Sequence, residues 1–262
     1  MELAGYAASI LIGLILGMLG GGGSILSIPI LVYLFQIDVV MASAYSLFIV
    51  GTTSLVGAIS KYREHAVNFK SALLFGIPSV ISIFATRKWI VPAIPDVVWQ
   101  TDLLLISKRL LLLGLFAVLM VLASFSMIRG TNDYSSDDER FMPVLLIIQG
   151  MLIGFLTGLV GAGGGFLIVP ALVLLTGLTF KAAVGTSLFI IAISSLTGFL
   201  GDLMNYSMDW TFLLIITGLA VFGILLGNQF TQRISSIQLK RMFGWLILVV
   251  GCGILIRELT NV

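Results

Sequence analysis

Residues 13–31 read GLILGMLGGGGSILSIPIL, and residues 154–172 read GFLTGLVGAGGGFLIVPAL. Each stretch carries a run of glycines inside an apolar segment, followed a few residues later by a proline. Glycine is a poor helix former, so a run of glycines interrupts a helix. We therefore expect a helix break in the middle of each stretch, and these two breaks decide how the chain folds.

The two stretches lie in the longest segments that contain no Asp, Glu, Lys or Arg. These segments are residues 3–37 and 141–180, with lengths of 35 and 40 residues. A membrane-crossing helix needs only about 20 residues, so each segment predicts two helical pieces joined at its glycines. Shorter uncharged segments predict one helix each, at 39–60, 71–86, 110–128, 182–201, 210–232 and 242–256. The sequence thus predicts about ten helical pieces, an all-α membrane fold.

The composition agrees with a membrane protein. Hydrophobic residues make up 59% of the 262 residues, charged residues only 10%, and the mean hydropathy is +1.15. An ordinary soluble domain is roughly 25% charged, so this composition excludes a soluble enzyme and a disordered chain. The net charge of +2 is too weak for a nucleic-acid partner. We expect a multi-pass protein of the cell (inner or plasma) membrane whose surroundings are the lipid bilayer.

The chain repeats itself at an offset of 141 residues. Gly13–Gly57 aligns with Gly154–Gly198 without a gap, and 18 of 45 positions are identical. The identities include glycines, a proline and serines in register, which shared hydrophobicity alone would not produce. We expect a first membrane repeat at residues 1–130, a polar linker at 131–140 and a second membrane repeat at 141–262.

Loop charge favours an inverted relation between the repeats, because cytoplasmic loops carry an excess of Lys and Arg. With five helical pieces per half, one side carries nine basic residues: Lys61, Arg63, Lys70, Arg129, Arg140, Lys181, Arg233, Lys240 and Arg241. The other side carries five: Arg87, Lys88, Lys108, Arg109 and Arg257. We therefore expect a cytoplasmic linker, with both termini outside.

The glycine breaks are candidate substrate-binding elements. A helix that restarts after a break presents free N–H groups and its positive dipole end, both of which favour an anion. Paired broken helices in two inverted halves are typical of transporter sites near the membrane midplane. The other interpretation is close helix packing through small residues. The candidate residues are Gly21, Gly22, Gly23 and Ser24 in the first half and Gly163, Gly164 and Gly165 in the second.

Two further candidates are Ser46 and Ser187, which align in the repeat. A hydroxyl can donate to an anion without burying a charge, although membrane hydroxyls often bond to their own helix. Asp38, Asp202 and Asp209 lie at the ends of uncharged segments, where a carboxylate commonly caps a helix. The alternative for Asp202 is a proton-coupling acid.

The duplicated pattern resembles the sulfite exporter TauE/SafE family of membrane permeases. Each glycine stretch is followed by a small-residue helix, ASAYSLFIV in one half and AAVGTSLFI in the other, and GFLGDLMNYSMDW at 198–210 is also similar to a family segment. The resemblance covers essentially the whole chain, and it implies transport of small sulfur-containing or carboxylate anions without a cofactor. Two features depart from the pattern. Ala44 and Tyr45 stand where the second half has the more family-like Gly185 and Thr186, and the loop from Arg87 to Asp102 is longer than its counterpart.

The leading hypothesis from the sequence is a secondary transporter that works by alternating access. An anion-selective channel and a membrane scaffold or sensor without flux are the alternatives. No nucleotide-binding, metalloprotease or CxxC motif is present, and one histidine and one cysteine cannot build a metal site, so we expect neither an enzyme nor a cofactor or metal. The expected partners are a small anion and the bilayer, and a homodimer is one assembly that the sequence permits.

Overall fold

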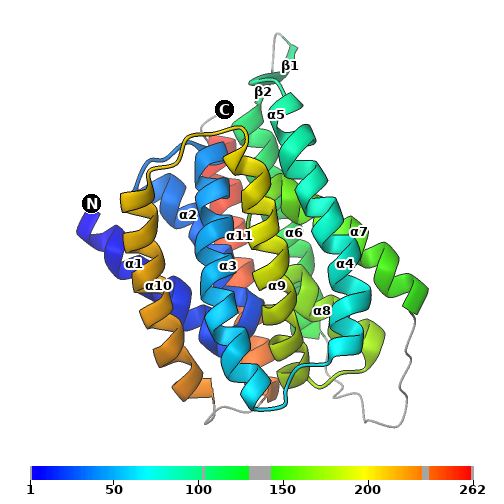
Figure 1. The fold of residues 1–262 in the computed structure, drawn as a ribbon. Helices are drawn as coiled ribbons and strands as arrows, with labels where there is room; N and C mark the ends of the chain where they lie inside the picture. Colours follow the sequence, from blue (N-terminus) through cyan, green and yellow to red (C-terminus); the bar gives the residue numbers. More distant parts are fainter. Residues whose placement is uncertain (1, 102–103, 130–142, 232–235, 261–262) are drawn as a thin grey trace.

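The structure is a computed structural model that describes residues 2–101, 104–129, 143–231 and 236–260. The first half contains α1 (Glu2–Leu19), η1 (Gly20–Gly23), α2 (Ser24–Pro29), η2 (Ile30–Leu34), α3 (Val39–Arg63), α4 (Phe69–Ala85), η3 (Thr86–Ile90), α5 (Val91–Ala93), β1 (Val97–Thr101), β2 (Leu104–Ser107) and α6 (Lys108–Arg129). The second half contains α7 (Pro143–Val160), α8 (Gly165–Thr176), α9 (Phe180–Leu203), α10 (Trp210–Thr231) and α11 (Ser236–Thr260). These helices form one bundle (Figure 1).

The all-α expectation is confirmed, and each long uncharged segment is broken at its glycines. The first segment folds as α1, a tight turn at Gly20–Gly23, and then α2 extended by η2. The second folds as α7 and α8, separated at residues 161–164. The structure adds a small antiparallel hairpin of β1 and β2 in the long loop before α6. The expected linker, Thr131–Arg140, lies outside the described residues.

The chain passes repeatedly between two ends of the bundle, which we call the upper and lower ends after Figure 1. At the upper end, the backbone N–H of Asp209, just before α10, donates to the hydroxyl of Tyr45 in α3 at 2.9 Å. At the lower end, the backbone N–H of Asn68, just before α4, donates to Thr186 in α9 at 3.0 Å. Helices α3 and α9 therefore run in opposite directions.

The two broken segments enter from opposite ends. Helix α1 starts at the upper end and η2 returns to it, since Phe35 packs against both Tyr6 of α1 and Phe212 of α10. Helix α7 starts at the lower end, and α8 returns to the lower end (Figure 1). Each broken segment is thus a helical hairpin with its glycines at the tip inside the bundle.

The main helix pairings follow the repeat. Helix α1 packs along α10, and α4 packs along α7. Because α7 corresponds to α1 in the repeat and α10 corresponds to α4, the second contact is the repeat equivalent of the first. The other two large contacts join repeat partners directly, α3 with α9 and α6 with α11. A twofold relation between the halves would generate this set of contacts. The inverted orientation in the membrane stays a prediction.

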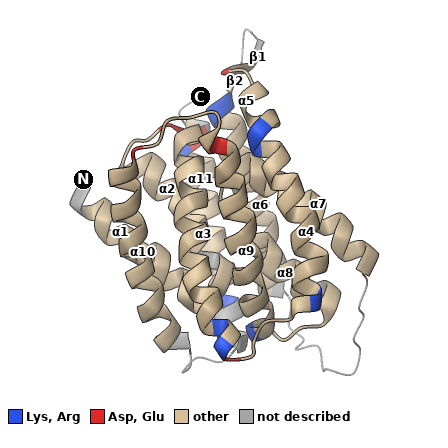
Figure 2. Cartoon of the chain, in the orientation of Figure 1, with Lys and Arg blue, Asp and Glu red and all other residues tan. Residues whose placement is uncertain are grey.

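The protein is a multi-pass membrane protein. Among the described residues, six helices are long and apolar enough to cross a bilayer: Val39–Arg63, Phe69–Ala93, Lys108–Phe125, Pro143–Val160, Phe180–Leu203 and Trp210–Gln229. On α4, Leu73, Ile77 and Ile81 recur at helical spacing and are each more than half exposed, as expected of a lipid-facing stripe. Charged side chains lie close to the two ends of the bundle (Figure 2).

Cysteine labelling tests the orientation. With Cys252 replaced by Ser, we expect His65→Cys to react with an impermeant thiol reagent only from the cytoplasmic side and Asp96→Cys only from outside. Both positions are exposed, in the loop after α3 and just before β1, at opposite ends of the bundle. The reason is the excess of basic side chains at the lower end. The reverse labelling pattern would refute the orientation while leaving the fold untouched.

Candidate functional site

The tips of the two broken hairpins touch. A Cβ placed on Gly21 of η1 would collide with the backbone of Gly165, and a Cβ on Gly165 would collide with that of Gly21. Gly165 is also the first residue of α8. The two glycine clusters singled out in the sequence therefore meet at one point, where one half of the chain faces the start of a helix from the other.

The first cluster is a compact turn. Gly20 has φ +66°, a left-handed conformation that glycine adopts at no steric cost, and it packs against Val184 of α9. Gly22 follows within the turn, and Gly23 lies against the backbone of α1 at Ile12. Ser24 is fully buried, and its hydroxyl donates to the Gly21 carbonyl at 2.6 Å. This hydroxyl is used to hold the turn.

The second cluster depends more strongly on glycine. Gly161, Gly163 and Gly164 have φ values of +82°, +67° and +69°. Gly164 is the N-cap of α8, and no side chain caps this helix. The first N–H groups of a helix lack partners within the helix, so the start of α8 is an electropositive terminus in the interior.

The two predicted serines have different partners. The Ser46 hydroxyl shares a hydrogen bond of 2.5 Å with Ser27, whose own hydroxyl lies 2.6 Å from the Ser24 carbonyl. Ser46 is thereby tied to the first glycine turn. Ser187 donates to the carbonyl of Val184, three residues earlier in its own helix, at 2.8 Å. Both are fully buried.

Another pair of serines that align in the repeat was not selected from the sequence, and one of them lies against the second cluster. Ser54 and Ser195 are fully buried, and neither hydroxyl has a hydrogen-bond partner among the described residues. A Cβ on Gly163 would lie 3.0 Å from the Ser195 hydroxyl oxygen. Ser46 and Ser187 were selected instead. The identity of Ser54 with Ser195 in the two repeats was the signal that could have selected this pair.

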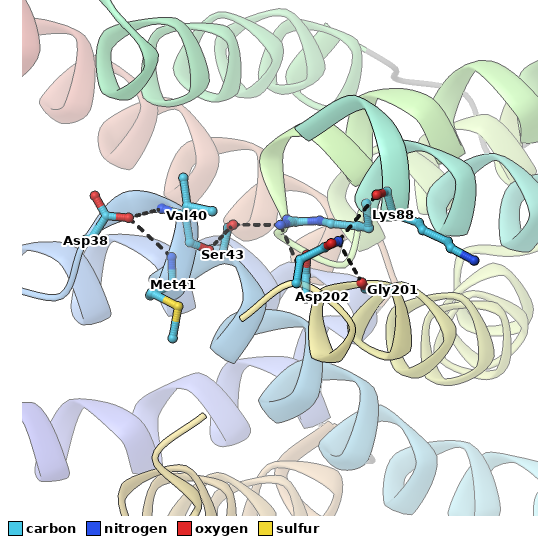
Figure 3. A network of polar contacts seen from close by, with 9 residues as sticks. Asp38, Val40, Met41, Ser43, Lys88, Gly201 and Asp202 are labelled. Atoms are coloured by element: carbon cyan, nitrogen blue, oxygen red, sulfur yellow. Dashed lines mark hydrogen bonds and ion pairs between the residues drawn. The ribbon is translucent and has the colours of Figure 1, made fainter. Parts of the chain in front are cut away.

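Asp202 forms a buried ion pair. Its Oδ2 lies 3.3 Å from Nη1 of Arg87, and both side chains are fully buried. The same Nη1 donates to the hydroxyl of Ser43 in α3 at 2.8 Å. Figure 3 shows Ser43 and Asp202 on either side of this contact, with α3 and α9 contributing one each. The sequence predicted Asp202 as a candidate but gave no partner for it.

The other two carboxylates at segment ends cap helices, as expected. Asp38 accepts hydrogen bonds from the backbone N–H groups of Val40 and Met41 at the start of α3 (Figure 3). Asp209 accepts from the backbone N–H of Phe212 at the start of α10. Asp202 lies near the C-terminal end of α9 instead, where a carboxylate does not serve as an N-cap.

Arg87 is buried, although the sequence predicted that it lies in a loop. It was counted with the loop charges, yet it lies in η3 at the end of the α4 segment and is the largest fully buried side chain described. A Cβ on Gly161 would collide with its Nη2, so the guanidinium packs against the second glycine cluster. Nothing in a local sequence window distinguishes this arginine from the neighbouring Lys88.

The groups that meet at this centre are mainly hydrogen-bond donors. It offers an uncapped helix terminus at α8, the unpaired hydroxyl of Ser195 and the buried guanidinium of Arg87, all of which donate hydrogen bonds. No group of three His, Cys, Asp or Glu residues that could hold a metal ion occurs within the described parts of the chain.

Comparison with known proteins places the chain among membrane transporters. A family model described as sulfite exporter TauE/SafE matches residues 6–254. A probable membrane transporter protein of Xylella fastidiosa (strain 9a5c) is 29% identical, over 95% of this chain and 92% of the relative. The probable membrane transporter protein YunE of Bacillus subtilis is 27% identical, over 95% and 97%. A probable membrane transporter protein of Methanocaldococcus jannaschii is 27% identical, over 94% of each chain. No solved structure matches the chain.

Proposed function

The chain belongs to the sulfite exporter TauE/SafE family, and from that premise we propose that this membrane transporter moves a small sulfur-containing or carboxylate anion by alternating access around its two glycine breaks. The observation that carries the proposal is the contact between Gly21 and Gly165, where the tips of two oppositely entering hairpins meet. Irregular backbone at membrane depth is tolerated where it is buried in protein or lines a substrate cavity. The binding site would comprise Gly21, Gly22, Gly23, Ser24, Ser46, Gly163, Gly164, Gly165 and Ser187, with Asp202 as the acid that couples a proton.

The expected affinity is weak. A helix terminus contributes about 0.3–1 kcal/mol when exposed and up to about 2 when partly buried. Each hydrogen bond to a charged group adds about 1.5–3 kcal/mol. A few such contacts correspond to micromolar to millimolar binding, which suits a carrier that must release its cargo.

Counterflow in proteoliposomes tests the proposal. The purified chain is reconstituted, and labelled sulfite, thiosulfate, sulfoacetate and acetate are offered outside while the same unlabelled anion fills the vesicles. A carrier accumulates label transiently against its gradient, whereas a channel only equilibrates it. Equilibration without overshoot would favour the anion channel, and no flux of any probe would favour a scaffold or sensor.

The unpaired serines give a quantitative prediction. We expect Ser195→Ala and Ser54→Ala each to weaken binding of the transported anion about tenfold, the loss of roughly one hydrogen bond. Their hydroxyls are buried without partners, so removing them costs the empty protein little. Thr217→Ala is the control, since Thr217 is also buried but donates to the carbonyl of Leu213 in its own helix. Titration calorimetry measures the three affinities, and unchanged values for both serine variants would show that neither hydroxyl contacts the anion.

A further inference from the structure

The ion pair between Arg87 and Asp202 leaves most of its hydrogen-bonding capacity unused. A guanidinium has five N–H donors, and a carboxylate can accept two of them side by side. Here Nε and Nη2 of Arg87 donate to no described residue, and neither oxygen of Asp202 accepts an aligned hydrogen bond from one. The pair is a single contact of 3.3 Å between two fully buried side chains.

The free donor faces the centre of the protein. Nη2 lies against Gly161, the first residue of the second glycine cluster, while Nη1 is held by Ser43 and Asp202. A planar guanidinium matches the oxygens of a carboxylate or an oxyanion of sulfur better than an ammonium does. Arg87, the buried positive charge that the structure describes at this end of the bundle, thus has an open donor directed at the break where α8 begins.

We propose that Arg87 binds the charged group of the transported anion, and that Asp202 is a built-in carboxylate which occupies Arg87 when no anion is present. This inference rests on the proposed transport function. When an anion binds Arg87, Asp202 loses its only described ion-pair partner. It then takes up a proton from water, so that a carboxylate and a proton become a neutral carboxylic acid. Anion binding and proton uptake are thereby coupled.

The physical reason is the cost of buried charge. Two anions on one guanidinium leave a net negative charge in a water-poor interior, where an uncompensated buried carboxylate is far less stable than its protonated form. When an anion arrives, either the Asp202 side chain moves away from Arg87 or its carboxylate becomes protonated. With a singly charged anion, each arrangement keeps the net charge around Arg87 at zero, which is the least costly state inside a membrane.

The other charged groups nearby are already engaged. Asp38, just before α3, caps that helix, and Asp209, just before α10, accepts from the first turn of α10. Lys88, next to Arg87, lies over the rings of Phe84 and Trp89. Helix α7 contains no acidic or basic residue, and Asp96 is exposed before β1.

One titratable phenol also lies close to the pair, in the loop between α9 and α10. Burial raises the pKa of Tyr206, and the neighbouring Asp202 carboxylate raises it further, so this phenol stays neutral at physiological pH. Of the groups facing Arg87, Asp202 is therefore the one whose protonation can respond to an arriving anion.

The test measures proton uptake when anions bind. Purified full-length protein in a weakly buffered solution with a pH indicator receives sulfite, thiosulfate, sulfoacetate or acetate, and calorimetry gives the affinity for each. We expect about one proton taken up per singly charged anion, such as acetate, bound by the wild type. The double variant Arg87→Gln with Asp202→Asn removes both charges together, so it leaves no unpaired buried ion. It should bind at least about tenfold more weakly and take up no proton.

Two controls separate this site from a general effect of charge. Glu258→Gln neutralises another buried carboxylate at the same end, which pairs with Arg109 at 3.1 Å, and it should leave proton uptake and affinity unchanged. Arg87→Lys keeps the charge but not the planar fork, and it should bind more weakly while still taking up a proton. Wild-type affinity in the double variant would overturn the role of Arg87, and anion binding without proton uptake in the wild type would overturn that of Asp202.

Counterflow in the same preparations distinguishes this inference from the proposed function. Wild-type counterflow that survives in the double variant would overturn the Arg87 site and leave the carrier in place. Proton-coupled binding without any counterflow would support the site and refute the carrier. A wild type that neither binds nor moves any of the four probes would refute both.

Discussion

Gly165→Val is expected to reduce counterflow to background while the protein still inserts into the membrane. Gly165 and Gly21 are in backbone contact, so any side chain at Gly165 must push the two hairpin tips apart. A β-branched valine also stiffens the first turn of α8. Gly164→Val should act similarly, because its φ of +69° is strained for a branched residue.

The matched control is Gly218→Val in α10, since a Cβ at Gly218 meets no atom within 4 Å. It introduces the same side chain at an exposed helical glycine and should leave flux near that of the wild type. Membrane fractionation and size-exclusion profiles check insertion and folding for all three variants. Wild-type counterflow in Gly165→Val would show that the meeting of the tips is a packing feature with no part in transport.

Breaking the buried ion pair on one side is expected to produce the largest loss of stability. Asp202→Ala leaves the guanidinium of Arg87 buried with Ser43 as its one described hydrogen-bond partner. Removing one partner of a buried pair typically costs about 3–5 kcal/mol. Replacing both charges, as in Arg87→Gln with Asp202→Asn, should recover most of this loss, because no uncompensated charge remains.

Thermal unfolding in detergent, followed by intrinsic fluorescence, compares these variants. Glu64→Gln is the reference, since its pair with Lys61 at 2.8 Å is about two-fifths exposed on the glutamate side. An exposed pair contributes only about 0–1 kcal/mol, so this change should shift the unfolding midpoint little. If Asp202→Ala unfolds no earlier than Glu64→Gln, Arg87 must find compensation that the structure does not contain.

The helical architecture could be predicted from the sequence because the features that determine it are local. The absence of charge over 35 and 40 residues, the glycine runs and the in-register repeat are each visible without knowing what packs against what. They were enough to predict broken helices at Gly20–Gly23 and near Gly161–Gly164, and the structure contains both. The hairpin of β1 and β2 was not predicted, because Val97–Thr101 was interpreted only as part of a proline-containing loop, although its Val and Trp residues favour a strand.

The candidate site could be predicted from the sequence only in part, because its ion pairs and hydrogen bonds join residues that are far apart in the chain. Arg87 and Asp202 are 115 residues apart in sequence, and each taken alone resembles an interfacial charge at the end of a helix. The serines show the same limit. Ser187 and Ser195 lie on one helix, yet only the fold reveals that the first bonds to its own backbone and the second has no partner.

The pairing of α1 with α10 and of α4 with α7 has a consequence for folding and motion. The first helix of each half packs against a helix of the other half, as in a domain-swapped dimer. Neither half therefore encloses a core of its own. A chain cut at the linker should therefore yield fragments that need each other to become protease-resistant. In the proposed alternating access, each moving body would likewise be assembled from helices of both halves, and the boundary between moving bodies would not coincide with the boundary between the two sequence repeats.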